Sequence, residues 1–146
     1  MSFFGEERRP IDAKSRIVLP SRFRAQMMDD KGRAELFLTR GTNGCLYLFP
    51  TKNWEEIKTR FAGSDFNTEA EKYKQRLFYS SIKFQACDRQ GRIVLPESHK
   101  KIAGLGSEGV FIGIDDHVEL WDTKTWDKYC ANGEGEYEKS MSQSSD

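Results

Sequence analysis

The sequence has few cysteines: among 146 residues there are only Cys45, Cys87 and Cys130. Their number is odd and no two of them form a Cys-x-x-Cys pair, so the sequence predicts neither a disulfide framework nor a zinc knuckle. We therefore expect three reduced thiols that lie in or near the hydrophobic core.

Long hydrophobic runs are also absent. No apolar stretch reaches the roughly 18 residues that a membrane-spanning helix needs. Residues 1–10 contain no long apolar region followed by a small-residue cleavage site, so no signal peptide is predicted. The expected location is the cytoplasm, without contact to a membrane.

Histidine is equally scarce, which argues against an enzyme. His99 and His117 have no metal-ligand or triad-like spacing, and each is expected at the surface. No glycine-rich phosphate loop follows a predicted strand, because the Gly104-Leu-Gly106 segment is too short to form one. The sequence predicts no catalytic residue, no metal site and no cofactor.

The chain has no net charge, with 23 basic and 23 acidic residues, which by itself argues against a general nucleic-acid binder. The charges are unevenly distributed, however. Residues 8–24 contain six Lys or Arg and one Asp, a net charge of +5, whereas residues 101–146 contain four Lys and ten acidic residues, a net charge of −6. This asymmetry indicates a basic contact surface on an acidic body, although a solvated charged segment would give the same count.

An internal repeat dominates the sequence. Asp12-Ala-Lys-Ser-Arg-Ile-Val-Leu-Pro20 recurs 76 residues later as Asp88-Arg-Gln-Gly-Arg-Ile-Val-Leu-Pro96. Two further blocks recur in the same order, namely Leu36–Leu38 as Val110–Ile112 and Leu48–Trp54 as Leu120–Trp126. One match could arise by chance, but three in the same order indicate a duplicated half-domain.

Each half has the same expected order of elements. A short extended segment leads into the Asp-x-x-x-Arg turn, an Arg-Ile-Val-Leu strand, a helix that proline opens, two strands and a second helix. These elements divide the chain into a first half at 1–62, a connecting helical segment at 63–81 and a second half at 82–130. Residues 131–146 lack apolar periodicity and are expected to be a disordered polar tail.

The Asp-x-x-x-Arg turn can hold its own ends together, because the two side chains flank a tight turn and can meet across it. Such ion pairs, Asp12 with Arg16 and Asp88 with Arg92, add only about 0–1 kcal/mol at an exposed site, so their value is geometric. For the second copy this bracing role is the favoured interpretation, because residues 84–100 have a net charge of only +1.

The first copy is expected to bind DNA. Its candidate contacts are Lys14, Arg16, Arg8, Arg9, Arg22 and Arg24. Lys14 lies at the tip of the turn and Arg16 on its shoulder, where they can read guanine O6 and N7 in the major groove. The two arginines before the turn can bind phosphates and so fix the register. The two arginines of the following helix can reach the DNA backbone or remain solvated, and both interpretations stay open.

Together these residues resemble the MraZ family of bacterial transcriptional regulators, which is related to the AbrB-type DNA-binding proteins. The resemblance rests on the two Asp-x-x-x-Arg motifs, the Ile-Val-Leu-Pro after each, Ala103-Gly-Leu105 and Glu119-Leu-Trp121, and it covers about residues 1–130. It implies an α/β fold in which two tandem AbrB-like halves with pseudo-twofold symmetry form one small β-barrel-like domain.

The resemblance also implies a function. It implies a homo-oligomeric ring, an octamer or dodecamer, that associates with the nucleoid and binds direct G-rich repeats in double-stranded promoter DNA. It further implies repression of the division and cell-wall gene cluster that contains the protein's own gene. By position, Arg16 matches the family's DNA-contacting arginine and Lys14 its basic turn residue. The alternative interpretation is an AbrB-like antitoxin or a protein-interaction module without a promoter-binding role.

One residue departs from the family pattern. Ser15 stands where the family usually has Gly, which Gly91 keeps in the second copy. A turn that needs positive φ favours Gly, because the side chain of Ser meets a steric penalty there. The conformation of the first turn is therefore open at the level of sequence.

Overall fold

The computed structural model describes residues 1–144 of the chain. Its strands are β1 (Glu6–Pro10), β2 (Arg16–Val18), β3 (Glu35–Arg40), β4 (Leu46–Pro50), β5 (Lys83–Ala86), β6 (Arg92–Val94), β7 (Glu108–Ile114) and β8 (His117–Asp122). Its helices are α1 (Ser21–Met27), the short 3₁₀ helix η1 (Thr51–Asn53), α2 (Trp54–Ala62), α3 (Glu69–Ser80), α4 (Glu97–Ala103) and α5 (Thr123–Ser144). The α/β class predicted from the sequence is confirmed.

The strand order is symmetric with respect to the sequence repeat. Six strands form one antiparallel sheet in the order β1-β7-β8-β4-β3-β5, in which β1 corresponds to β5, β7 to β3 and β8 to β4. Strands β2 and β6 form a separate two-stranded ribbon. Equivalent residues of the two halves pair in both places: Ile17 faces Ile93 in the ribbon, and Tyr47 faces Glu119 in the sheet. The halves are therefore related by an approximate twofold axis through these two pairs.

The β-barrel-like form that the resemblance implies is not confirmed. In the described residues the sheet order is linear, with β1 and β5 as its two edges, so no closed barrel forms. The reason lies in the Asp-x-x-x-Arg turns that follow β1 and β5. Each turn redirects the chain into β2 or β6, and these two strands pair with each other rather than closing the sheet.

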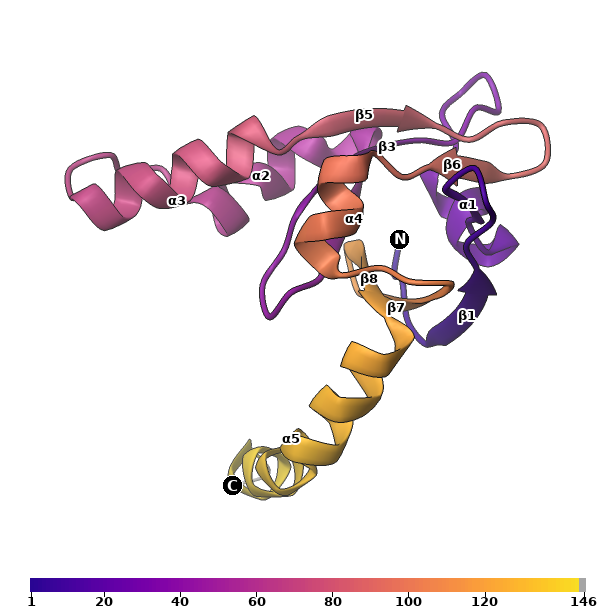
Figure 1. The fold of residues 1–146 in the computed structure, drawn as a ribbon. Coiled ribbons are helices and arrows are strands. Elements are labelled where there is room, and N and C mark those ends of the chain that lie inside the picture. Colours follow the sequence, from indigo (N-terminus) through magenta and orange to yellow (C-terminus); the bar gives the residue numbers. More distant parts are fainter. Residues whose placement is uncertain (145–146) are drawn as a thin grey trace.

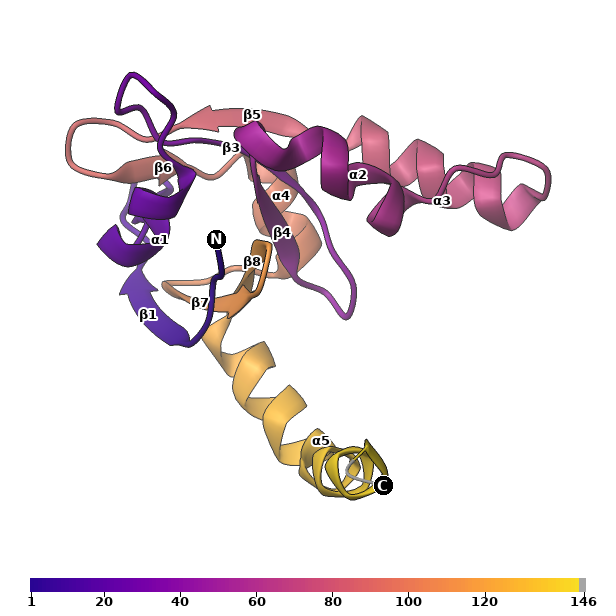
Figure 2. The same ribbon diagram turned by 180° about the vertical axis from the view of Figure 1, so that it is seen from behind.

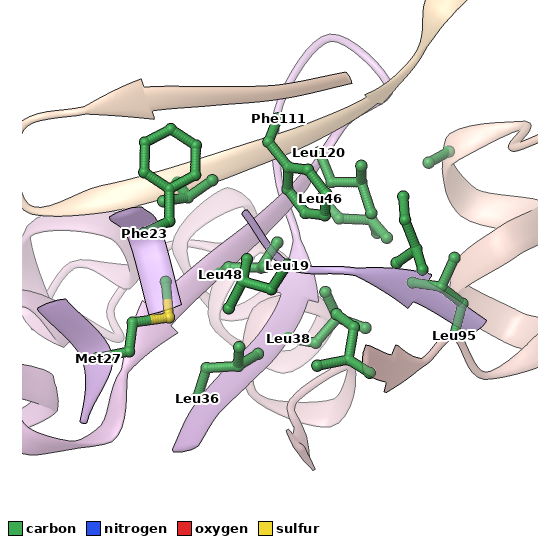
Figure 3. Close-up of a cluster of buried hydrophobic side chains, with 14 of the residues drawn as sticks. Leu19, Phe23, Met27, Leu36, Leu38, Leu46, Leu48, Leu95, Phe111 and Leu120 are labelled. Carbon is green, nitrogen blue, oxygen red and sulfur yellow. The ribbon is translucent and has the colours of Figure 1, made fainter. Parts of the chain in front are cut away.

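The repeated motif supplies the centre of the hydrophobic core. In each copy the isoleucine and the leucine are buried while the valine between them is exposed, as expected for a strand with one face on the core. Figure 3 shows Leu19 and Leu95, one from each copy, in the same cluster as Leu38 of β3 and Leu48 of β4. Because both halves contribute to this cluster, neither half has a complete core alone.

Helices α1 and α4 pack on this core, whereas the α2–α3 hairpin and α5 extend away from it (Figure 1). Helices α1 and α4 follow Pro20 and Pro96, as the sequence predicts. Helix α3 begins after Thr68, whose Oγ1 accepts a hydrogen bond of 3.1 Å from the backbone N of Glu71. Helices α2 and α3 form a hairpin that extends to one side of the sheet, and α5 extends in a different direction (Figures 1 and 2).

The disordered tail expected at 131–146 is not what the structure has. Helix α5 starts at Thr123 and continues through residues 131–144, while residues 145–146 lie outside the described part. The start of α5 is anchored because Trp126 and Tyr129 pack on Trp121 of β8. Beyond this anchor, residues 131–144 contain three Glu, one each of Ala, Lys, Met and Gln, and no proline, and the helix continues through its two glycines.

The thiols and imidazoles differ in part from the sequence-based expectation. Cys45 is buried and Cys87 half-buried, and burial raises their pKa values to about 12 and about 11, but Cys130 is exposed on α5. His99 and His117 are both buried rather than at the surface. His99 forms hydrogen bonds to the Ser81 carbonyl at 2.6 Å and to the Ser98 hydroxyl at 3.1 Å, and so ties α4 to the end of α3.

The burial of His99 predicts a stability that depends on pH. Burial lowers the pKa of His99, although the bond to Ser81 opposes this. The unfolded chain takes up this proton below about pH 6.5, whereas the folded chain does so only at a lower pH, so stability falls as pH drops below about 6.5. Urea unfolding is expected to give a lower free energy of unfolding at pH 5.5 than at pH 7.5. In His99→Gln this difference in free energy is expected to be smaller. An equal loss in parent and variant would contradict this assignment.

Candidate nucleic-acid interface

The first Asp-x-x-x-Arg turn is held together by the carboxylate of Asp12. Its Oδ1 accepts hydrogen bonds from the backbone N of Lys14 and of Arg16, both at 2.9 Å, and its Oδ2 accepts one from Nε of Arg16 at 2.7 Å. The backbone closes the turn with bonds from Asp12 N to the Arg16 carbonyl and from Ser15 N to the Asp12 carbonyl. These bonds, above all the one from the backbone of Arg16, lower the pKa of Asp12, so the carboxylate stays ionised.

The second turn repeats this geometry. Oδ1 of Asp88 accepts from the backbone N of Gln90 and of Arg92 at 2.9 Å, and Oδ2 accepts from Nε of Arg92 at 2.8 Å. The backbone hydrogen bond from Arg92 is the largest cause of the lowered pKa of Asp88. The structure therefore contains both motif ion pairs, and in each of them the arginine uses only its Nε.

This arrangement leaves the ends of both guanidinium groups available. Among residues 1–144, the two terminal nitrogens of Arg16 have no protein partner, and the exposed ammonium of Lys14 has none either. In the second turn the terminal nitrogens of Arg92 and the exposed guanidinium of Arg89 are likewise unpaired within the described chain. Each turn thus presents two cations on a rigid backbone, which is the geometry needed to bind an acceptor pair.

The other four sequence-predicted contacts have partners within the protein. Arg8 pairs with Asp127 at 2.6 Å, and Arg9 pairs with Glu7 at 3.1 Å. Arg22 pairs with Glu7, donates to the Phe4 carbonyl at 2.5 Å and lies over the ring of Phe23. Arg24 donates to the Leu19 carbonyl at 2.8 Å. The structure therefore brings Lys14 and Arg16 together as free cations and does not add these four arginines to them.

Ser15 adopts the conformation that the family's glycine would have. Its φ is 61°, close to the 79° of Gly91 in the second turn. Its hydroxyl accepts a hydrogen bond of 2.9 Å from Nζ of Lys100 on α4. Lys100 lies 76 residues after Arg24, so these two cations are equivalent in the repeat. Arg24 packs against Gly91, and each half therefore places one cation on the turn of the other half.

With these crossing cations included, the two turns have the same charge. The first turn gathers Lys14, Arg16 and Lys100 with Asp12, and the second gathers Arg89, Arg92 and Arg24 with Asp88. Each cluster has three cations and one anion, a net charge of +2. The sequence-based distinction between a basic first motif and a nearly neutral second motif therefore has no counterpart in the structure. The excess charge of residues 8–24 came from Arg8, Arg9 and Arg22, whose side chains pair with Asp127 and Glu7 instead of joining the first turn.

The two turns are expected to tolerate a side chain at their fourth position differently. A Cβ added at Gly91 would overlap Nη1 of Arg24 and lie 2.7 Å from its Cζ, at a positive φ. Gly91→Ala is therefore expected to destabilise the fold by about 1–2 kcal/mol. Ser15→Gly removes the steric penalty at positive φ but also removes the hydrogen bond from Lys100. Its free energy of unfolding is therefore expected to stay within about 0.5 kcal/mol of the parent value. Urea unfolding measures both, and equal effects would contradict the contact between Arg24 and Gly91.

A third Asp-x-x-x-Arg segment was not predicted as a site from the sequence. Asp29-Asp-Lys-Gly-Arg33 lies between α1 and β3, outside the repeat and without the Ile-Val-Leu-Pro that follows the other two copies. A search for the five-residue pattern alone would have found it. Oδ2 of Asp29 accepts a hydrogen bond from Nε of Arg33 at 3.1 Å, as in the other turns.

Two further classes of site are absent from residues 1–144. No helix in this part of the chain is long and apolar enough to cross a lipid bilayer. Nor do three or more His, Cys, Asp or Glu side chains there gather into a group that could hold a metal ion.

Comparison with known proteins gives one consistent result. The family model of the MraZ proteins, described as antitoxin-like, matches the chain twice, at residues 3–77 and 78–144. The chain is 32% identical over 137 residues to the transcriptional regulator MraZ of Desulforamulus reducens, which covers 94% of this chain and 93% of the relative. It is 37% identical over 128 residues to the protein of the same name from Kineococcus radiotolerans, covering 87% and 85% of the two chains. A family of transcriptional regulators is not a family of enzymes. With two matched repeats and this extent of identity, the chain belongs to the MraZ family.

Proposed function

We propose that the chain is a sequence-specific, double-stranded DNA-binding transcriptional regulator that represses its own division and cell-wall gene cluster. It binds direct G-rich repeats in the promoter and works in the cytoplasm, associated with the nucleoid. The names of the relatives support a regulatory role. The family resemblance supports the promoter repeats and the autorepression.

The observation that carries this proposal is the free guanidinium end of Arg16 on a turn that Asp12 holds rigid. Two parallel N–H donors match the O6 and N7 acceptors of guanine in the major groove, and a good pair of this kind discriminates by about 1–3 kcal/mol. Lys14 beside it supplies a second donor or a phosphate contact. Because the turn around Asp88 has the same geometry and charge, we extend the proposal to Arg92 and Arg89.

The remaining arginines have a different role in this proposal. Arg8, Arg9 and Arg22 orient β1 and the start of α1 through their acidic partners, and Arg24 supports the second turn. A phosphate can compete for those at the surface, so their contribution to affinity is smaller than that of Lys14 and Arg16.

The proposal includes a homo-oligomeric ring, an octamer or dodecamer as the family resemblance implies. A single chain offers few phosphate contacts, and binding that rests on few contacts is weak and sensitive to salt. Several copies in a ring can engage several repeats at once, so avidity supplies the affinity. Repeats that recur about every helical turn, roughly 10 bp, would present the same face of the DNA to successive subunits.

The test is binding to the DNA upstream of the chain's own gene, compared with a shuffled duplex of the same length and composition. We expect at least about 10³-fold tighter binding to the upstream DNA, because specific sites exceed non-specific ones by that margin or more. Affinity should fall steeply as salt rises. Equal binding to both duplexes, or none to either, would contradict the proposal and favour the alternative of an antitoxin or protein-interaction module.

A further inference from the structure

The turn at residues 29–33 is a structural copy of the two motif turns. Asp29 Oδ1 accepts hydrogen bonds from the backbone N of Lys31 and of Arg33, both at 2.9 Å, as the aspartates of the other turns do. Asp29 N donates to the Arg33 carbonyl at 2.7 Å, and Gly32 N donates to the Asp29 carbonyl at 3.1 Å. Gly32 has a φ of 75°, between the values of Ser15 and Gly91. All five bonds and the positive φ are therefore shared by the three turns.

In its tip residue this third turn resembles the first turn more than the second. Lys31 occupies the place of Lys14, whereas the second turn has Gln90 there. The guanidinium of Arg33 is bound only through Nε, and its side chain is 60% exposed, twice the exposure of Arg16. Within the described chain the ammonium of Lys31 is exposed and has no partner. The turn thus presents a lysine and an arginine in the same relation as the proposed DNA-reading turn.

The third turn lies beside the second turn. Strands β3 and β5 are paired, so the turn that precedes β3 meets the turn that follows β5. The backbone N of Cys87 donates to the Ala34 carbonyl at 3.0 Å at this junction. In Figures 1 and 2 both loops lie at the end of the molecule opposite the α2–α3 hairpin. No corresponding turn flanks the first motif, because only residues 104–107 join α4 to β7 there.

One carboxylate opposes a role in binding an anion. Asp30 is exposed in the turn and has no cationic partner among residues 1–144. It reduces the net charge of the turn to zero, since Asp29 already balances Arg33. The cations at this turn therefore suit a supporting contact rather than the main source of affinity.

We infer that the turn at residues 29–33 is a third DNA-binding site of this chain, which contacts the phosphate backbone next to the duplex segment held by the second turn. The inference rests on the proposed function. It makes the DNA footprint around the second turn longer than that around the first turn. Lys31 supplies a sequence-independent phosphate contact, Arg33 supports it, and Asp30 weakens it.

The test uses the full-length chain, a duplex from upstream of its gene and a shuffled duplex, with affinity measured at several salt concentrations. Lys31→Ala is expected to weaken binding to both duplexes by about three- to tenfold and to reduce the slope of log affinity against log salt by about 0.9 per bound chain. Asp30→Asn is expected to strengthen binding by about two- to threefold, because it removes a charge within a Debye length of the phosphates. Lys74→Ala and Asp65→Asn, the same changes on the α2–α3 hairpin, are the matched controls and should leave binding unchanged.

The outcomes separate this inference from the proposed function. If the parent chain binds the upstream duplex and Lys31→Ala and Asp30→Asn both behave like their controls, the third site is wrong and the proposed function stands. If the parent shows no salt-dependent binding to the upstream duplex, the proposed function fails and the third site fails with it. An effect of Lys31→Ala on the upstream duplex alone would show base reading and would contradict a phosphate contact.

Discussion

Replacing Lys14 and Arg16 with glutamate is expected to lower the affinity for the upstream DNA by more than about 100-fold. Each bidentate guanine contact contributes about 1–3 kcal/mol, and every 1.4 kcal/mol is a factor of ten. The substitution also places two carboxylates against phosphates, and an oligomer repeats the loss at each bound subunit. Fluorescence anisotropy with the upstream duplex measures the change.

The fold of the double variant is expected to survive. Two backbone N–H groups still donate to Asp12 in the first turn, so the loop keeps most of its hydrogen bonds when the side chain of Arg16 is lost. Thermal unfolding and the oligomeric state by light scattering check this. The control is Lys74→Glu on the α2–α3 hairpin, which reverses an exposed charge at the opposite end of the molecule (Figure 1). Unchanged DNA affinity in a folded double variant would refute the placement of the DNA contact.

Ile93→Ala is expected to destabilise the chain by about 2–5 kcal/mol, as for other isoleucines removed from a well-packed core. Ile93 is fully buried and lies on the approximate twofold axis opposite Ile17. Its side chain belongs to the cluster that both halves build together. The loss should therefore appear as a lower midpoint of one cooperative urea transition, because the halves share one core.

The neighbouring Val94 is the matched control. It lies one residue along the same strand and is 53% exposed. Val94→Ala is expected to change stability by less than about 0.5 kcal/mol. Two separate transitions in the parent would show that the halves fold independently, as a division at residues 1–62 and 82–130 would allow. Equal losses for the two variants would contradict the place of Ile93 in the shared core.

The repeat made much of this fold predictable. Three matched blocks indicated a duplicated half-domain, and the proline, turn and β-branched signals gave the order of strands and helices that each half has. What the blocks could not show is how the halves meet. Tertiary structure determines the pairing of Ile17 with Ile93 and of Tyr47 with Glu119, because the local sequence of a strand does not specify which strand it pairs with. The helical tail was missed for a different reason: aromatic packing on Trp121 starts α5, and composition alone does not reveal that anchor.

The candidate site was predictable in its residues but not in its environment. Lys14 and Arg16 could be chosen from the sequence, and the structure leaves both with free donors. The charge around each turn could not be predicted, because a count along the chain includes arginines that pair with acidic residues away from the turn. Nor could the contact of Lys100 with Ser15, which crosses the twofold axis. This contact also accounts for the departure at Ser15. The Cβ of Ser15 makes positive φ less favourable than it is for Gly, but the side chain also carries the hydroxyl that accepts from Lys100, the residue equivalent to Arg24 of the other half.

The most direct test of the central claim, that Arg16 reads guanine in the major groove, combines a protein variant with a DNA variant. Replacing the guanines of the repeats one at a time with 7-deazaguanine removes the N7 acceptor and leaves base pairing intact. For the contacted guanine, the parent chain is expected to lose about tenfold or more in affinity, whereas Arg16→Ala should lose nothing further, because the two changes remove the same bond. Equal losses for the parent chain and Arg16→Ala at every guanine would contradict the account.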